Sequence, residues 1–122
     1  LVDLVVRDHQ GHSGLQVLDI CTGSGCIPLA LAANLQIHKV YGLELSEGAL
    51  KVARANARQL KLPVAWLQQD VFEPLLGIAS HSLDIITSNP LQGAIINRDL
   101  NMGIGLSPAV AWKMFSTICH IA

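Results

Sequence analysis

The chain has 122 residues, of which 51% are hydrophobic and 14% are charged, and its net charge is −1 at pH 7. These values fit one globular domain with a real core and exclude a mainly disordered chain. The nearly neutral charge gives no global attraction for nucleic acid or for an anionic membrane. Three cysteines without paired spacing argue against a disulfide scaffold and a zinc finger, and an odd number is typical of a reducing, intracellular compartment.

The first third of the chain predicts a helix, a strand, a glycine-containing loop and a second helix. Residues 1–7 have the composition of the last turns of a helix, and residues 15–19 (LQVLD) form a short apolar run that ends in an acid. Residues 22–26 (TGSGC) are expected to form a tight loop before a helix over residues 27–35. Residues 20–38 carry no Asp, Glu, Lys or Arg, but their glycines, proline and polar side chains favour this strand, loop and helix over a membrane span.

The next segments repeat the alternation. Residues 39–45 (KVYGLEL) predict a second strand, and Ser46 is expected to cap a helix over residues 47–60. A third strand is expected over residues 64–69 (VAWLQQ) and a fourth over residues 83–87 (LDIIT). Strands that alternate with helices are typical of βαβ units, so the sequence predicts an α/β fold with a parallel sheet.

Three of the predicted strands end at an acid. Asp19 and Glu44 are 25 residues apart, and Glu44 and Asp70 are 26 residues apart, which is about one strand plus one helix. The carboxyl ends of parallel strands meet at one edge of the sheet, and ligands bind there. We therefore expect the three carboxylates to lie along the same edge.

The residues at this edge suit a nucleoside with a positive charge. Gly23 and Gly25 let a ligand approach the backbone closely. Glu44 is placed to accept hydrogen bonds from two ribose hydroxyls, Asp70 from an exocyclic amine such as that of adenine, and Asp19 to face a cationic group. Ribose, adenine and a cation together describe S-adenosylmethionine.

A dinucleotide is the rival ligand. Its fingerprint has a glycine or alanine three residues after Gly25, where this chain has Pro28. An anionic pyrophosphate is also disfavoured beside Asp19. No Gly-Lys-Ser/Thr follows the loop, which excludes a phosphate-binding P-loop.

Four segments in fixed order carry a family resemblance. They are residues 19–27 (DICTGSGCI), 40–46 (VYGLELS), 69–72 (QDVF) and 84–90 (DIITSNP). Together they resemble the motifs of class I S-adenosylmethionine-dependent methyltransferases. They are most similar to the HemK/PrmC group, the protein-(glutamine-N5) methyltransferases that modify peptide chain release factors.

This resemblance implies a Rossmann-like fold, S-adenosylmethionine as the cofactor and a release factor as the protein substrate. Asn89 and Pro90 are the implied catalytic residues, because in the family this pair holds the target amide in line with the methyl group. The residues implied in cofactor binding are Asp19, Cys21, Thr22, Gly23, Ser24, Gly25, Glu44, Leu45, Asp70, Val71 and Asn89.

The sequence departs from the family pattern at three places. Cys21 stands where many members have a glycine, and Glu44 replaces the more usual aspartate. After Pro90, Leu91 and Gln92 replace the second proline and the tyrosine of the Asn-Pro-Pro-Tyr motif. These last replacements predict a largely complete cofactor site beside an incomplete substrate site.

We expect one domain over residues 1–122. Residues 15–90 resemble the family, and residues 91–122 form a divergent tail with an amphipathic helix predicted over residues 107–121. Because only 32 residues follow Pro90, the sheet is expected to be partial, with about four strands and without the family's C-terminal ones.

Two further functions stay open. Related Asn-Pro-Pro-Tyr enzymes methylate amines in nucleic acid, although the net charge does not favour such a substrate here. The other is a non-catalytic remnant that binds S-adenosylmethionine. A dehydrogenase is disfavoured with the dinucleotide, and the scattered histidines do not favour a metal. The expected location is intracellular, either cytoplasmic or mitochondrial.

Overall fold

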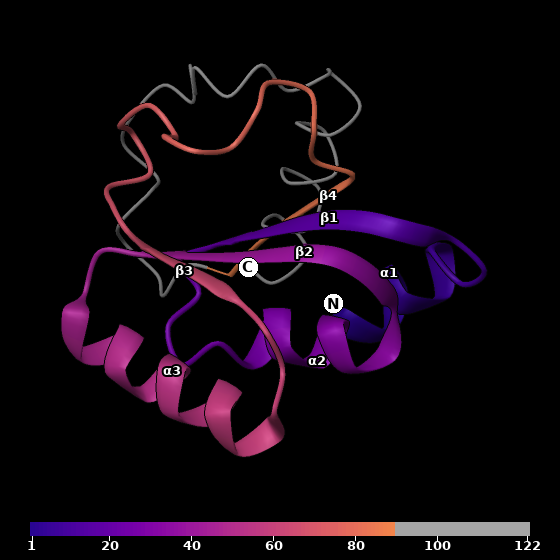
Figure 1. Ribbon diagram of the computed structural model, residues 1–122, viewed down its shortest axis with the longest axis horizontal. Coiled ribbons are helices and arrows are strands. Elements are labelled where there is room, and N and C mark those ends of the chain that lie inside the picture. Colours follow the sequence, from indigo (N-terminus) through magenta and orange to yellow (C-terminus); the bar gives the residue numbers. More distant parts are fainter. Residues whose placement is uncertain (90–122) are drawn as a thin grey trace.

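The computed structural model describes residues 1–89 (Figure 1). Pro90, Leu91, Gln92 and the predicted tail helix lie outside the described residues. Helices and strands alternate along the described part. The elements are α1 (Val2–Asp8), β1 (Ser13–Ile20), α2 (Cys26–Asn34), β2 (Gln36–Glu44), α3 (Glu47–Leu60), β3 (Ala65–Gln68) and β4 (Ile85–Ser88).

The four strands form one parallel sheet in the order β3-β2-β1-β4. The chain moves outward from β1 through β2 to β3 and then returns to add β4 on the other side of β1. Such a reversal of strand order opens a crevice at the carboxyl ends of the two strands beside it, and ligands bind in crevices of this kind. The predicted α/β architecture is therefore confirmed.

The two faces of the sheet are covered differently. In Figure 1 the three helices lie under one face, and residues 69–84 pass over the other. On the helix side, Val17 and Ile85 pack with Leu31 of α2 in one apolar cluster. On the opposite side, Leu18 and Leu43 belong to a second cluster, against which parts of residues 69–84 pack. Alternate strand residues point to opposite faces, so one sheet supports both clusters.

Several element boundaries differ from the sequence prediction by a few residues. β1 begins at Ser13 and β2 at Gln36, because these two polar residues pair with each other beyond the apolar part of the sheet. α2 begins one residue early, at Cys26, directly after the left-handed Gly25. β4 begins later than predicted and continues through Ser88. β2 ends one residue earlier than predicted, at Glu44, and β3 (Ala65–Gln68) lacks one predicted residue at each end. The helix predicted over residues 47–60 is confirmed.

A capping residue explains the start of α3. The side chain of Ser46 accepts a hydrogen bond from the backbone N–H of Ala49 at 3.3 Å, as predicted for an N-cap. Leu50, Ala53 and Ala57 face the sheet and are buried. Among residues 1–89, no helix has the length and apolar character needed to cross a membrane.

Candidate functional site

The turn after β1 forms the centre of the candidate site. Its backbone is tied to β2 by a hydrogen bond from the N–H of Thr22 to the carbonyl of Leu43, at 3.0 Å. Three of its residues have positive φ angles, namely Cys21 (57°), Gly23 (57°) and Gly25 (79°). Glycine adopts such angles at little cost, whereas the cysteine is strained. The position where the family pattern has a glycine is therefore one that demands a left-handed residue.

The indole ring of Trp66 on β3 packs against this turn. A Cβ atom at Gly25 would lie 2.7 Å from Cη2 of the Trp66 ring, and one at Gly42 would lie 2.5 Å from Cζ3. The indole ring therefore occupies the space that side chains at these two glycines would need. At Gly23, by contrast, a Cβ atom would meet no atom of residues 1–89 within 4 Å, so these residues leave the outer side of the turn open.

Two polar side chains fix the turn from neighbouring elements. The side-chain amide of Asn56 on α3 donates to the carbonyl of Ser24 at 3.0 Å. Glu44, at the end of β2, accepts from the N–H of Gly23 at 3.0 Å through Oε2. Its other oxygen accepts from the N–H groups of Leu45 (2.9 Å) and Ser46 (3.0 Å). Glu44 thus links the glycine turn to the start of α3.

Asp19 is the most deeply buried acid of the site. Its side chain is 0% exposed, and Oδ1 accepts a hydrogen bond of 2.6 Å from the hydroxyl of Thr87 on β4. Burial raises the pKa of Asp19 from its ordinary value of 3.8 to about 6. The hydroxyl of Thr87 partly offsets this rise by lowering the pKa. The hydroxyl of Thr22 also lowers the pKa, but less, and it makes no well-formed hydrogen bond among the described residues. Oδ2 of Asp19 has no hydrogen-bond partner among the described residues.

Cys21 marks the point where the three predicted carboxylates meet. Burial raises the pKa of its thiol, and the negative charges of Glu44, Asp19 and Asp70 raise it further. Asp19 and Glu44 stand at the carboxyl ends of the parallel strands β1 and β2, and Asp70 follows the end of β3, so all three acids lie at the same edge of the sheet. The sequence prediction that they share one edge of the sheet is confirmed.

Asp70 and Val71 follow β3 on the same side. Oδ1 of Asp70 accepts from the N–H of Phe72 at 3.0 Å, which closes a short turn. Val71 packs against the apolar cluster on the face opposite the helices. Asp70 is thus held in place by local backbone, while Val71 contributes to the core beneath it.

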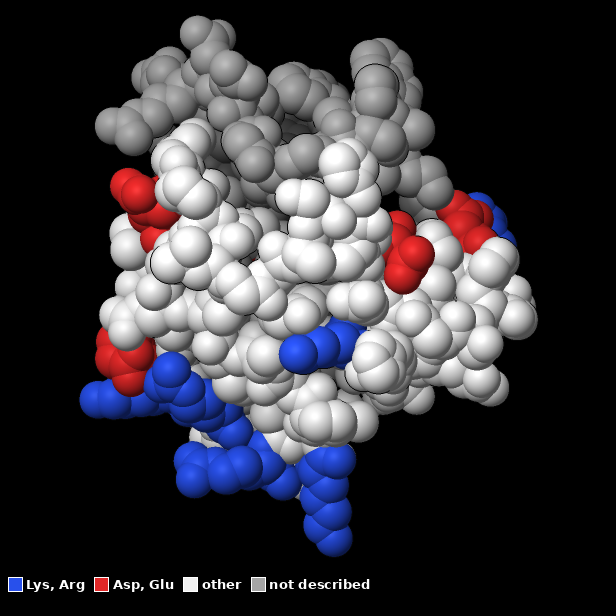
Figure 2. All heavy atoms as spheres, turned by 45° about the horizontal axis from the view of Figure 1, so that its top comes forward, with Lys and Arg blue, Asp and Glu red and all other residues white. Residues whose placement is uncertain are grey.

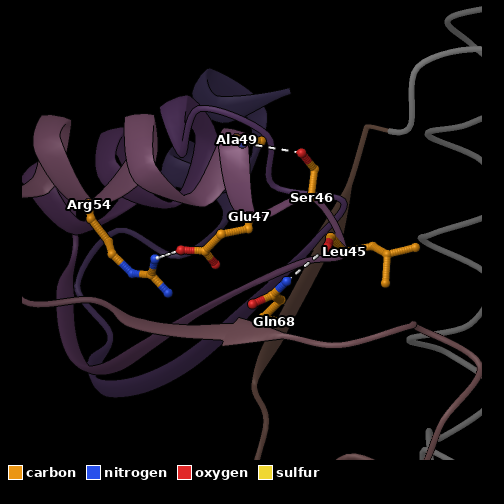
Figure 3. A network of polar contacts seen from close by, with 6 residues as sticks. All are labelled: Leu45, Ser46, Glu47, Ala49, Arg54 and Gln68. Atoms are coloured by element: carbon orange, nitrogen blue, oxygen red, sulfur yellow. Dashed lines mark hydrogen bonds and ion pairs between the residues drawn. The ribbon is translucent and has the colours of Figure 1, made fainter.

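Leu45 offers an apolar surface beside Glu44. Its side chain is 64% exposed and points away from α3 (Figure 3). Its carbonyl accepts from the amide of Gln68 on β3 at 3.4 Å. In the same view, Arg54 and Glu47 form an ion pair of 2.9 Å on α3. The backbone of Leu45 is therefore anchored while its side chain remains available for contact.

The predicted catalytic residues lie at the end of β4. Asn89 follows this strand directly and is exposed, and Pro90 is outside the described residues. β4 pairs with β1 from Val17↔Ile85 to Ile20↔Ser88. This register places Asn89 beside the turn that carries Cys21.

Within residues 1–89, no group of three or more His, Cys, Asp or Glu side chains is arranged to hold a metal ion.

Lys and Arg side chains gather at the side of the molecule where α3 lies (Figure 2). The basic residues of α3 and of its C-cap are Lys51, Arg54, Arg58 and Lys61.

Three residues that shape the site were not singled out for it from the sequence. They are Thr87, which bonds Asp19, Asn56, which bonds the turn, and Trp66, whose ring packs against the turn. Thr87 carried a usable signal, because a hydroxyl within a predicted buried strand needs a partner. The roles of Asn56 and Trp66 depend on tertiary contacts that no local pattern reveals.

Residues 17–102 match the model of a protein family described as "Methyltransferase domain". The release factor glutamine methyltransferase of Bacteroides thetaiotaomicron is 46% identical over 90 residues, which are 74% of this chain and 31% of that protein. The protein of the same name from Streptococcus pneumoniae is 37% identical over 107 residues, covering 88% of this chain and 36% of that protein. The chain thus spans about a third of the length of these curated relatives.

Solved structures agree on the fold. The YcgJ protein of Bacillus subtilis superposes with a TM-score of 0.61 at 25% identity, covering 71% of this chain and 36% of that one. An S-adenosylmethionine-dependent methyltransferase of Clostridium acetobutylicum has the same TM-score at 19% identity, over 71% of this chain and 34% of that one. The parallel sheet with its helices is therefore the Rossmann-like fold that the sequence predicted.

Proposed function

Because this chain belongs to the methyltransferase domain family, which matches residues 17–102, we propose that it binds S-adenosylmethionine and takes part in methylating a glutamine side chain of a peptide chain release factor. The substrate class rests on one observation, the 46% identity over 90 residues to a protein named release factor glutamine methyltransferase. The proposal places the protein inside the cell, where release factors act.

The residues at the carboxyl edge of the sheet fit this cofactor. Asp19 has a buried oxygen without a partner among the described residues, which suits a nearby cation. The open side of Gly23 gives a ligand access to the backbone, and Leu45 presents an apolar surface. The proposed binding residues are Asp19, Cys21, Thr22, Gly23, Ser24, Gly25, Glu44, Leu45, Asp70, Val71 and Asn89.

Each carboxylate has a separate proposed task. Glu44 keeps its two oxygens in a fixed position through three backbone N–H groups, and of its roughly four lone-pair sites one, on Oε2, is left for a ribose hydroxyl. Asp70 lies beyond the end of β3, where it is placed to accept from an adenine amine. Asp19 supplies negative charge beneath the turn.

The chemistry is mainly a matter of positioning. The cofactor supplies an electrophilic methyl group when it is bound. Asn89 is proposed to hold an N–H of the target amide through its side-chain oxygen, and Pro90 to hold the other N–H through its carbonyl. Restricting the amide in this way aims its nitrogen and removes much of the entropic cost of the reaction.

Calorimetric titration with S-adenosylhomocysteine tests the cofactor step. We expect saturable binding by the 122-residue chain and a loss of that binding in Glu44→Ala. Glu47→Ala is the matched control, since it removes a carboxylate three residues away that pairs only with Arg54 in the described contacts. Equal binding by the wild type and Glu44→Ala would contradict the proposed site.

Methyl transfer to a peptide containing Gly-Gly-Gln tests the substrate. Transfer to the glutamine, with none to a Gly-Gly-Asn peptide of the same length, would support the proposed substrate and overturn the expectation of an incomplete substrate site. A second candidate, cofactor binding without catalysis, is favoured by Leu91 and Gln92, which replace the proline and tyrosine of the family motif. Binding without any transfer would support this second candidate.

A further inference from the structure

Asp19 and Thr87 form a cross-strand polar pair inside the sheet. They are direct partners in the register of β1 and β4. The hydroxyl of Thr87 donates to Oδ1 of Asp19 at 2.6 Å, and the two residues are 0% and 3% exposed. Such a short bond to a buried carboxylate is strongly favourable, because a charged acceptor strengthens it and little water competes.

The other oxygen of Asp19 is left without a partner among the described residues. A buried carboxylate with unfilled hydrogen-bonding capacity is costly, and a cation nearby reduces the cost. The charge of Asp19 also extends to the turn, because it raises the pKa of the half-buried Cys21 thiol. Glu44 and Asp70 act on the same thiol, so the negative potential at the turn comes from three elements.

The described contacts thus give Asp19 one side-chain hydrogen-bond donor, on the strand that leads to the proposed catalytic Asn89. We propose that Thr87 is a positioning residue for the cofactor: its hydroxyl holds one oxygen of Asp19 and leaves the other to attract the ammonium group of the amino-acid end. This inference rests on the proposed function, because it assumes that the cationic end of the ligand lies over the turn.

The alternative is that Thr87 only fills space in the sheet. Valine has nearly the same shape and suits a buried strand, so it would serve equally well in that role. The two roles differ in which part of the ligand they affect. A space-filling role would influence every ligand equally, whereas a role through Asp19 concerns only ligands with the ammonium group.

The experiment compares two ligands on three variants by calorimetry. S-adenosylhomocysteine carries the amino-acid end, and methylthioadenosine carries the same nucleoside without it. In Thr87→Val we expect the affinity for S-adenosylhomocysteine to fall about tenfold and that for methylthioadenosine to stay within about twofold, as loss of one charged hydrogen bond implies. Thr87→Ser, which retains the hydroxyl, is expected to restore binding of S-adenosylhomocysteine.

Ile86→Val is the matched control for packing, because it removes one methylene from the neighbouring β4 residue on the opposite face. It is expected to leave the ratio of the two affinities unchanged. An equal loss for both ligands in Thr87→Val, or no loss for either, would overturn the inference while leaving the proposed function in place. Failure of the wild-type chain to bind either ligand would overturn both.

Discussion

The ends of β1 and β2 each carry a carboxylate, but the two are supported in opposite ways. Asp19 is fully buried and has one hydroxyl partner, with its second oxygen unpaired among the described residues. Glu44 is half-buried and accepts from three backbone N–H groups. One acid is short of donors and the other is well supplied.

The different numbers of hydrogen-bond donors around Asp19 and Glu44 suit these two carboxylates to different tasks at one edge of the sheet. A carboxylate rich in backbone donors is oriented and inexpensive to keep charged, so Glu44 holds the glycine turn in place. A buried carboxylate short of donors retains an electrostatic cost that a bound cation can offset. We infer that the Glu44 region is built for rigidity and the Asp19 region for attraction of charge.

The largest loss of stability is expected at Gly25, in the turn that follows β1 and packs on the Trp66 ring. Gly25→Ala places a Cβ atom against the Trp66 ring and also forces a left-handed φ on alanine. We expect a loss of about 3–4 kcal/mol in the free energy of unfolding, from strain and overpacking together. Urea denaturation of the variant measures it.

Gly23→Ala is the control for this prediction. It has the same left-handed requirement, but within the described part of the chain its Cβ atom would meet nothing closer than 4 Å. Its loss is expected to be about 1–2 kcal/mol, the cost of the backbone alone. Equal losses at the two glycines would show that Trp66 does not constrain the turn.

The next effect tests the cost of the buried charge at β1. The pKa of Asp19 is raised from 3.8 to about 6, so the folded state holds this proton more tightly than the unfolded chain does. The cost of ionisation is fully present above pH 6, reaches about 3 kcal/mol, and disappears below pH 3.8. We therefore expect the stability of the wild type, relative to Asp19→Asn, to rise as the pH falls from 7 to 4.

Thermal or urea unfolding of both proteins across this pH range gives the difference. The comparison cancels pH effects that do not involve the Asp19 carboxylate, since the two proteins differ at this one residue. A difference independent of pH would mean that Asp19 has the same proton affinity in the folded and unfolded chains.

A smaller effect is expected at β2 from shortening the carboxylate by one methylene. In Glu44→Asp we expect the shorter side chain to lose the hydrogen bond to the N–H of Gly23, 21 residues away, and to keep the local one to Ser46, two residues away. We expect a loss of about 1–2 kcal/mol in stability, the value of one charge-assisted hydrogen bond. Amide hydrogen exchange should become faster at Gly23 than at Ser46, and equal protection at both would contradict the anchoring role.

The sequence predicted the sheet and the position of the acids because both follow from local patterns. Apolar runs and a regular spacing of 25 and 26 residues were enough to place Asp19, Glu44 and Asp70 together. The cap at Ser46 was predicted for the same reason, since a capping residue acts on its own helix.

The parts that escaped prediction depend on contacts between distant segments. Asp19 and Thr87 are 68 residues apart, and their hydrogen bond exists only because β4 returns to the side of β1. The early starts of β1 and β2 likewise come from pairing between Ser13 and Gln36. How much each carboxylate is buried, and which donors surround it, is set by packing and not by spacing.

The smallest predicted effect separates the cap of α3 from the carboxylate beside it. Ser46→Ala removes the hydroxyl that accepts from Ala49 but keeps the backbone N–H that donates to Glu44. We expect the free energy of unfolding to fall by about 1 kcal/mol, as is usual for loss of an N-cap. The affinity for S-adenosylhomocysteine should stay within about twofold, because Glu44 retains all three donors. If that affinity fell with stability, the rigidity of the β2 end would depend on the helix start as much as on the carboxylate.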